Sequence, residues 1–154
     1  MPTLARRHLV GIGATLAVAQ ALFTALPGLA AHRPLLSVWK QHRSVCCTTW
    51  AWLFQSAGFT VIIHDVDDVV AARAAAGVPA DLAGCHTARV DGYTIEGHVP
   101  VASVVHLLAQ RPALIGLAVA GMPRGAPGLE LAGALTEPFE VVAFDADGAR
   151  RPFV

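Results

Sequence analysis

The fold of this chain is constrained most by a strand–helix–strand pattern between residues 35 and 64. The apolar, β-branched and aromatic run at 35–39 predicts a strand, and the run at 59–64 predicts a second strand that is apolar enough to lie inside a sheet. Apolar residues at three- and four-residue spacing predict a helix between them, and Gly58 ends it. Because a helix joins the two strands, we expect them to pair in parallel. This pattern is typical of an α/β protein.

Two adjacent cysteines, Cys46 and Cys47, lie where the first strand ends and the helix begins. A helix amino terminus carries partial positive charge, so a thiol there loses its proton more easily and becomes a better nucleophile or soft-metal ligand. We expect Ser44 to be the N-cap, with its hydroxyl on a free N–H group. The predicted buried face of the helix consists of Cys46, Cys47, Trp50, Leu53, Phe54 and Ala57. The third cysteine, Cys85, lies between two other predicted elements.

The rest of the chain predicts a helix, a hairpin, a second helix and a final strand pair. Residues 69–76 form the first of these helices, and Asp65, Asp67 and Asp68 before it are interpreted as caps and first-turn acids, not as a hard-metal site. Asp91-Gly92 is typical of a type I′ turn. Hairpin strands are predicted at 87–90 and 93–96, and a helix follows Pro100 with an apolar stripe of Val101, Val104, Val105 and Leu108. An ordered, apolar Gly/Pro-rich loop is predicted at 113–138. The chain ends with a strand at 139–144 and a return strand at 150–153.

Residues 1–31 have the layout of an export signal. A charged start with two adjacent arginines precedes an almost wholly apolar run at 9–26, and Pro27 and small residues up to Ala31 provide a cleavage site. The arginine pair is similar to a twin-arginine signal, and the general secretory route stays open as well. We expect cleavage and not an uncleaved membrane anchor, because Gly, Gln and Pro interrupt the sequence. The predicted organisation is a signal at 1–31 and one domain at 32–154.

The composition limits the partners. The formal net charge is zero and no basic run appears, so we expect no nucleic-acid partner and no membrane contact after removal of the signal. With 154 residues, 55% of them hydrophobic, the chain suffices for one compact domain with its own core. In an exported protein, three cysteines form at most one bridge and leave one thiol. That count fits a metal site or a reactive thiol better than a structural disulfide framework.

The predicted order β-α-β-α-β-β-α resembles the thioredoxin fold, with an extra strand or hairpin and a Gly/Pro-rich loop at the carboxyl end. In that fold, the end of the first strand and the start of the first helix hold the reactive cysteines. The loop before the third strand, here residues 84–87, packs against them. The resemblance therefore implies that Cys85 approaches Cys46 and Cys47.

An ordered series of short motifs between about Leu36 and Phe153 carries a second resemblance. The motifs are Cys46-Cys47 with Trp50, Ala57-Gly58-Phe59, His64-Asp65-Val66-Asp67-Asp68, Gly77-Val78-Pro79, Cys85-His86-Thr87, Tyr93, Ile95-Glu96-Gly97-His98-Val99-Pro100 and Gly121-Met122-Pro123. In this order they resemble the small exported copper-binding proteins called CopG-like, catalogued as domain of unknown function 411. The resemblance implies a thioredoxin-like domain in the periplasm that binds copper(I) in copper handling or tolerance. We predict binding without enzymatic turnover.

Two soft sulfur donors of the family pattern are absent. The family's Cys-x-Cys-Cys motif reads Ser44-x-Cys46-Cys47 here, and Leu129 stands where the family has a second methionine. Soft donors select copper(I), so we do not expect the family's multi-copper thiolate cluster unchanged. The adjacent cysteines point about 100° apart on a helix and are expected to chelate one ion poorly. The candidate metal ligands are Cys46, Cys47 and Cys85, with His86, His98 and Met122 as weaker candidates, and the predicted occupant is copper(I), with zinc as the alternative.

Two other functions stay open. A thiol–disulfide redox protein would use Cys46 or Cys47 with Cys85, although the usual Cys-x-x-Cys motif is absent. A degenerate family member would bind a protein partner through the apolar loop at 113–135.

For the copper function, the predicted partners are the metal ion, other exported copper-handling proteins and a second copy of the chain that pools its sulfurs in a shared cluster.

Overall fold

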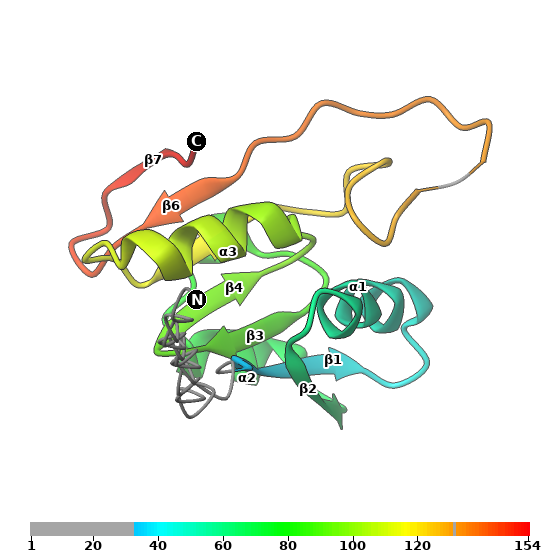
Figure 1. Ribbon diagram of the computed structural model, residues 1–154, viewed down its shortest axis with the longest axis horizontal. Helices are drawn as coiled ribbons and strands as arrows, with labels where there is room; N and C mark the ends of the chain where they lie inside the picture. The colour runs from blue at the N-terminus through cyan, green and yellow to red at the C-terminus, as the bar shows by residue number, and fades with distance from the viewer. Residues whose placement is uncertain (1–32, 131) are drawn as a thin grey trace, which may run out of the picture. The chain divides into compact units, whose positions relative to one another are not determined.

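The computed structural model describes residues 33–130 and 132–154, which contain one seven-stranded mixed sheet and three α-helices (Figure 1). The predicted export signal at 1–31 lies outside the described residues. The elements in chain order are β1 (Leu35–Gln41), α1 (Val45–Ser56), β2 (Thr60–Val66), α2 (Val69–Ala75), a 3₁₀ turn η1 (Ala80–Leu82), β3 (Thr87–Val90), β4 (Tyr93–Glu96), α3 (Val101–Gln110), β5 (Gly116–Ala118), β6 (Val142–Phe144) and β7 (Arg150–Pro152). The α/β class and the predicted order of the first seven strands and helices are confirmed. The thioredoxin-like assignment stays a prediction.

The sheet order β2-β1-β3-β4-β5-β6-β7 brings distant parts of the chain together. β1 and β2 pair in parallel, as predicted from the helix that joins them. β3 lies antiparallel on the other side of β1, with Thr87 opposite Trp39. The start of β3 is therefore next to the end of β1, and the loop before β3 meets the loop that leads into α1.

Helices cover both faces of the sheet, because strand residues alternate between two apolar clusters. On one face, α1 and α3 pack against a core that includes Val38, Trp50 and Leu107. On the other face, the end of α2 and η1 pack against Ala118 and Phe144. Figure 1 shows α1 and α3 in front of the sheet and α2 behind β3.

The β3–β4 hairpin forms as predicted. Asp91 and Gly92 have φ angles of 46° and 91°, so both central residues of the turn have the positive φ that type I′ requires. The turn fixes the register that pairs Thr87 with Glu96.

The carboxyl-terminal region differs from the prediction, because residues 116–118 form an interior strand of the sheet, β5, and not part of a loop. A Cβ atom at Gly116 would lie 1.8 Å from the carbonyl oxygen of Thr94, so β5 approaches β4 this closely only with glycine there. β5 bonds to β4 on one side and to β6 on the other. The predicted strand at 139–144 shortens to β6, and its predicted return strand is β7.

Two predicted helix faces are partly wrong. In α1, Leu53 and Ala57 are exposed and Ala51 is buried instead. In α3, Val105 is half exposed, and Leu107 takes its place in the core. The rest of each stripe is largely confirmed, because Cys47, Trp50 and Phe54 of α1 and Val104 of α3 are buried.

The predicted capping role holds for one of the three aspartates. Asp68 accepts hydrogen bonds from the N–H groups of Val70 and Ala71 at the start of α2. Asp65 instead pairs with Lys40 at 2.5 Å, and Asp67 lies 3.3 Å from His42. Sequence position alone did not reveal these cross-strand partners.

The Gly/Pro-rich loop lies against the domain, as predicted, in its first part. Ala126 is buried there, whereas residues 132–140 are exposed. Within the described part of the chain, no helix is long and apolar enough to cross a membrane.

Candidate metal centre

The first turn of α1 carries two of the three cysteines, and Ser44 lies at the N-cap position before it. The expected capping hydrogen bond is absent. The Ser44 hydroxyl instead donates to Cys47 Sγ at 2.9 Å, and it lies 3.5 Å from Cys46 Sγ and 3.9 Å from Cys85 Sγ. The side chain therefore points into a group of sulfur atoms and not back to the helix backbone.

The loop before β3 brings Cys85 to this helix start. Gly84, the residue before Cys85, forms an isolated parallel bridge with Gly121. A Cβ atom at Gly84 would lie 2.6 Å from Gly97 Cα, so a larger residue would push this loop away from the chain beside it. Glycine at position 84 thus permits the close approach that places Cys85.

A buried ion pair holds the same loop from the α2 face of the sheet. Arg73 Nε lies 2.6 Å from Glu96 Oε1, and the two side chains are 11% and 0% exposed. Glu96 Oε1 also accepts the Gly84 N–H at 2.7 Å, while Arg73 Nη2 donates to the Gly84 carbonyl oxygen at 2.7 Å. Thr87 donates to the other Glu96 oxygen. Both backbone groups of Gly84 are therefore held by charged side chains.

The three sulfur atoms meet. Cys85 Sγ lies 3.0 Å from Cys47 Sγ and 3.5 Å from Cys46 Sγ, and the two α1 sulfurs are 3.9 Å apart. Cys46 and Cys47, which were expected to point about 100° apart on the helix, thus have their sulfurs 3.9 Å apart, and Cys85 Sγ lies within 3.5 Å of both. All three thiols are free, with Cys47 fully buried and the other two partly exposed.

His98 completes the group of donors. One ligand atom from each of Cys46, Cys47, Cys85 and His98 lies within 4.8 Å of all the others. The His98 ring is oriented by its Nδ1, which lies 2.8 Å from the carbonyl oxygen of Pro127 and donates to it as the N–H tautomer. Its Nε2 is buried and has no hydrogen-bond partner. A buried lone pair beside three sulfurs fits a metal ligand.

The other two candidate ligands lie at different depths. His86 is fully buried, and its ring centroid is 4.2 Å from that of Trp50 and 5.1 Å from that of His98. Both of its ring nitrogens lack a hydrogen-bond partner, but it is not a member of the four-residue group. Met122 is 60% exposed, whereas the other candidates are buried or half-buried.

The electrostatics favour one shared proton between Cys47 and Cys85. The hydrogen bond between these two groups lowers the pKa of Cys85 and raises the pKa of Cys47, which burial raises further. The hydrogen bond thus favours the shared proton on Cys47 over Cys85. Burial lowers the pKa of His86 to about 4, so this imidazole is neutral near pH 7. A thiolate and neutral imidazoles are the protonation states that bind metals.

This donor set suits a soft or borderline metal ion. Three thiolate sulfurs select copper(I) or zinc over hard cations, and an added imidazole gives a Cys₃His set that zinc also accepts. The sequence predicted the three cysteines and His98, but it did not predict that Pro127 orients the imidazole or that Arg73 and Glu96 hold the Cys85 loop. The available signal for the ion pair was an acidic residue, Glu96, at the end of a predicted hairpin strand.

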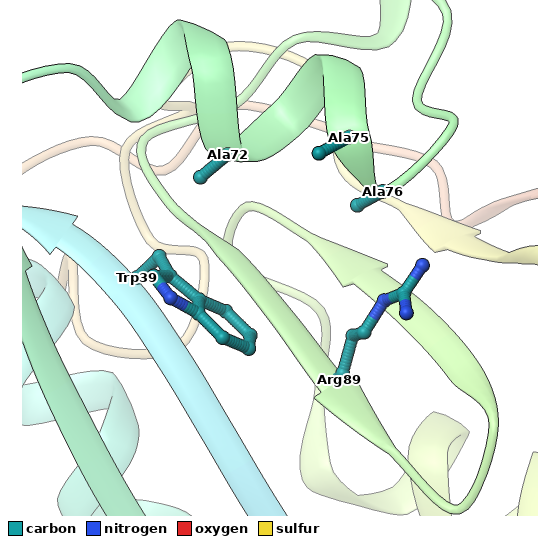
Figure 2. Close-up of a pocket in the computed structure, with 5 residues that line it drawn as sticks. All are labelled: Trp39, Ala72, Ala75, Ala76 and Arg89. Carbon is teal, nitrogen blue, oxygen red and sulfur yellow. The ribbon is translucent and has the colours of Figure 1, made fainter.

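A separate hollow lies between α2 and the sheet. This cavity of about 250 Å³ is lined by Trp39, Arg89 and the alanines of α2 and its end, and Figure 2 shows the indole and guanidinium groups facing Ala72, Ala75 and Ala76. Its lining contains no sulfur or imidazole. It therefore has no part in the donor group.

Comparison with known proteins relates the chain to proteins of copper resistance. Residues 82–129, which include Cys85, His86, His98 and Met122, match the family described as "Protein of unknown function, DUF411". No curated protein matches. The solved structure titled copper resistance protein copG, form 2, is 34% identical with a TM-score of 0.74, and the alignment covers 79% of this chain and 97% of that one. For form 1 the identity is also 34%, the TM-score is 0.73, and the coverages are 78% and 94%. With this identity over nearly the whole length of the solved chains, the protein belongs to the CopG-like DUF411 family.

Proposed function

We propose that this protein binds copper(I) as cargo, in copper handling or tolerance, through Cys46, Cys47, Cys85 and His98. The solved relatives are titled copper resistance proteins, which supports copper as the metal. In this proposal the protein holds and releases the ion without chemical turnover. Copper(I) accepts two or three soft ligands readily, so three sulfurs suffice for one ion.

The observation that carries the proposal is the environment of His98 Nε2. This atom is buried and unpartnered in a ring whose other nitrogen is already bonded to a backbone carbonyl. Leaving a buried polar atom unpaired costs on the order of 1–3 kcal/mol, a cost that a bound metal ion removes. Its neighbours in the group are three sulfurs, which supply the softness that copper(I) requires.

The test is an anaerobic copper(I) titration of the reduced protein against a chromophoric copper(I) chelator, with metal counted per chain. We expect at least one tightly held ion per chain. We also expect Cys85→Ser to weaken copper(I) binding at least tenfold, ~1.4 kcal/mol, because the ion loses one of three sulfurs. A parallel titration with zinc determines which metal the Cys₃His set prefers. No competition with the copper(I) chelator would exclude the proposal.

Export and transfer complete the proposed function. The predicted signal at residues 1–31 would deliver the domain to the periplasm, and N-terminal sequencing of the exported protein tests cleavage near Ala31. Other exported copper-handling proteins are the proposed donors and acceptors of the ion.

A homodimer that pools its sulfurs in a shared cluster is tested by measuring the mass of the protein in solution with and without copper(I). We expect the mass to double only when copper(I) is present.

A thiol–disulfide activity is the second candidate function, favoured by the 3.0 Å separation of Cys47 Sγ and Cys85 Sγ. Transfer of two electrons from this pair to a disulfide substrate would join the two sulfurs, with the thiol proton of the pair passing to the reduced substrate or to solvent. The 3.0 Å gap would then close to the ~2.05 Å of an S–S bond. This function leaves Cys46 without a role. The discriminating measurement is the rate at which the copper-free protein reduces a disulfide substrate. A redox enzyme that uses Cys47 and Cys85 would keep this rate in the Cys46→Ser variant.

A further inference from the structure

A cavity of about 420 Å³ opens directly beside the donor group. Cys46 lines it together with Val45 and Thr49 of α1, and Gly128 and Leu129 of the Gly/Pro-rich loop form the facing wall. Cys46 is the one cysteine of the group in this lining. Cys47, by contrast, is fully buried. The cavity therefore connects solvent to the donor group through Cys46.

Both walls of this cavity are attached to proposed ligands. α1 carries Cys46, and the loop is tied to His98 through the bond between His98 Nδ1 and the Pro127 carbonyl oxygen. Gly128 has a φ of +83°, and a Cβ atom there would lie 2.9 Å from the Cys46 carbonyl oxygen. The loop thus lies directly on the first turn of α1, and the width of the cavity depends on the same contacts that orient the ligands.

The two charged side chains in the lining of the cavity already have partners. Its rim carries Arg124 and Glu130, but Arg124 pairs with Glu137 at 2.8 Å and Glu130 accepts the Gly128 N–H at 2.6 Å. The remaining lining is mainly apolar. A charged thiolate would lose its hydration on entering such a space, whereas a neutral thioether would lose little. A thioether is also a soft donor that binds copper(I).

We propose that copper(I) enters through this cavity on the thioether of a methionine side chain from a donor protein, and that Cys46 is its first ligand. The proposal rests on the proposed copper function and adds the route and the donor class. In the transfer, the bond between copper and the thioether sulfur breaks as the bond between copper and Cys46 Sγ forms. The Cys46 proton passes to solvent, and copper remains copper(I), so no electron is exchanged. Cys47, Cys85 and His98 then complete the coordination.

The test blocks the cavity without removing a ligand. A helical side chain leans back over the preceding turn, so Thr49→Trp places an indole over Cys46 from the α1 side. Leu129→Trp fills the cavity from the loop side and serves if the first variant does not fold. Thr60→Trp is the matched control, because Thr60 lies beyond the far end of α1, some 18 Å along a twelve-residue helix.

Copper(I) delivery is followed by stopped flow, through the ultraviolet absorption of the copper–thiolate bonds. The donor is the copper(I) complex of a short methionine-rich peptide, and the comparison donor is copper(I)–glutathione. We expect either cavity variant to slow delivery from the methionine peptide at least tenfold, to slow delivery from glutathione less, and to keep equilibrium affinity within threefold of wild type.

Unchanged delivery rates in a folded, copper-binding variant would overturn the proposal that copper(I) enters through this cavity. Equal slowing with both donors would overturn the thioether assignment. Failure of the wild-type protein to hold copper(I) would instead contradict the proposed function.

Discussion

At residue 44, a hydroxyl oxygen lies within 3.9 Å of all three cysteine sulfurs. The family resemblance seen in the sequence implies a cysteine at this position, and the structure places the serine hydroxyl in the sulfur group. A sulfur at the same position would therefore face the other three with little change in backbone. We therefore expect this one atom to limit the number of soft donors in the group and, under the proposed function, the number of copper ions held.

We predict that Ser44→Cys raises the number of copper(I) ions bound per chain. The added thiolate supplies a bridging sulfur, which lets neighbouring ions share ligands. The measurement is copper(I) titration with metal and protein counted in the same sample. Ser44→Ala is the control, because it removes the hydrogen bond to Cys47 without adding a donor. Equal stoichiometry in Ser44→Cys and wild type would show that position 44 does not limit the site.

We predict that His98→Ala weakens copper(I) binding about tenfold, ~1.4 kcal/mol, through loss of the Nε2 donor and of the bond that ties Pro127. His106→Ala is a matched control, since His106 is an exposed histidine on α3 whose ring meets that of Phe153 edge to face. Chelator competition at constant pH measures both. A wild-type affinity in His98→Ala would remove this histidine from the site.

At the scale of elements, the Cys85 loop is positioned by its neighbours and not by its own sequence. Gly84 lets the loop approach Gly97, and the Arg73–Glu96 pair holds both backbone groups of Gly84. α2 and β4 thereby place a sulfur that belongs to neither element. A change in this ion pair should act on the stability of the fold and on the metal site together.

We predict that Glu96→Gln lowers the free energy of unfolding by about 3 kcal/mol, because it leaves the Arg73 cation largely buried without a counter-charge. Copper(I) affinity should fall as well, since the Gly84 N–H loses its charged acceptor. Glu137→Gln is the matched control, because its partner Arg124 is exposed and solvent screens such surface pairs, so that they contribute little to stability. Urea unfolding of the copper-free proteins gives the comparison. Similar midpoints for the two variants would contradict a structural role for the buried pair.

At the scale of the whole molecule, the chain's local patterns were sufficient to predict its first half and its hairpin. The helix between β1 and β2, and Asp91-Gly92 between β3 and β4, each specify pairing within a short stretch. β5 was missed because Gly116 weakens a strand signal, and its reason lies in a distant contact with Thr94. The site shows the same division: the cysteines are visible in the sequence, whereas the orientation of His98 depends on a loop about thirty residues further along.

The burial of His86 in the core gives the domain a predicted pH dependence. Its folded pKa of about 4 lies below the ordinary value of 6.5. The unfolded imidazole takes up a proton near pH 6.5 and the folded one only near pH 4, so the unfolded state binds more protons between these values. The contribution of His86 to stability is therefore complete above pH 6.5 and is lost as the pH falls towards 4, by up to about 3 kcal/mol.

The expected result is that copper-free His86→Phe loses less stability than wild type between pH 6.5 and 4, because phenylalanine cannot take up a proton in that core position beside Trp50. Chemical unfolding at a series of pH values measures the difference, with reduced cysteines throughout. His106→Phe should follow the wild-type curve, since His106 is an exposed histidine. Parallel curves for His86→Phe and wild type would mean that the buried imidazole does not control the acid sensitivity of this domain.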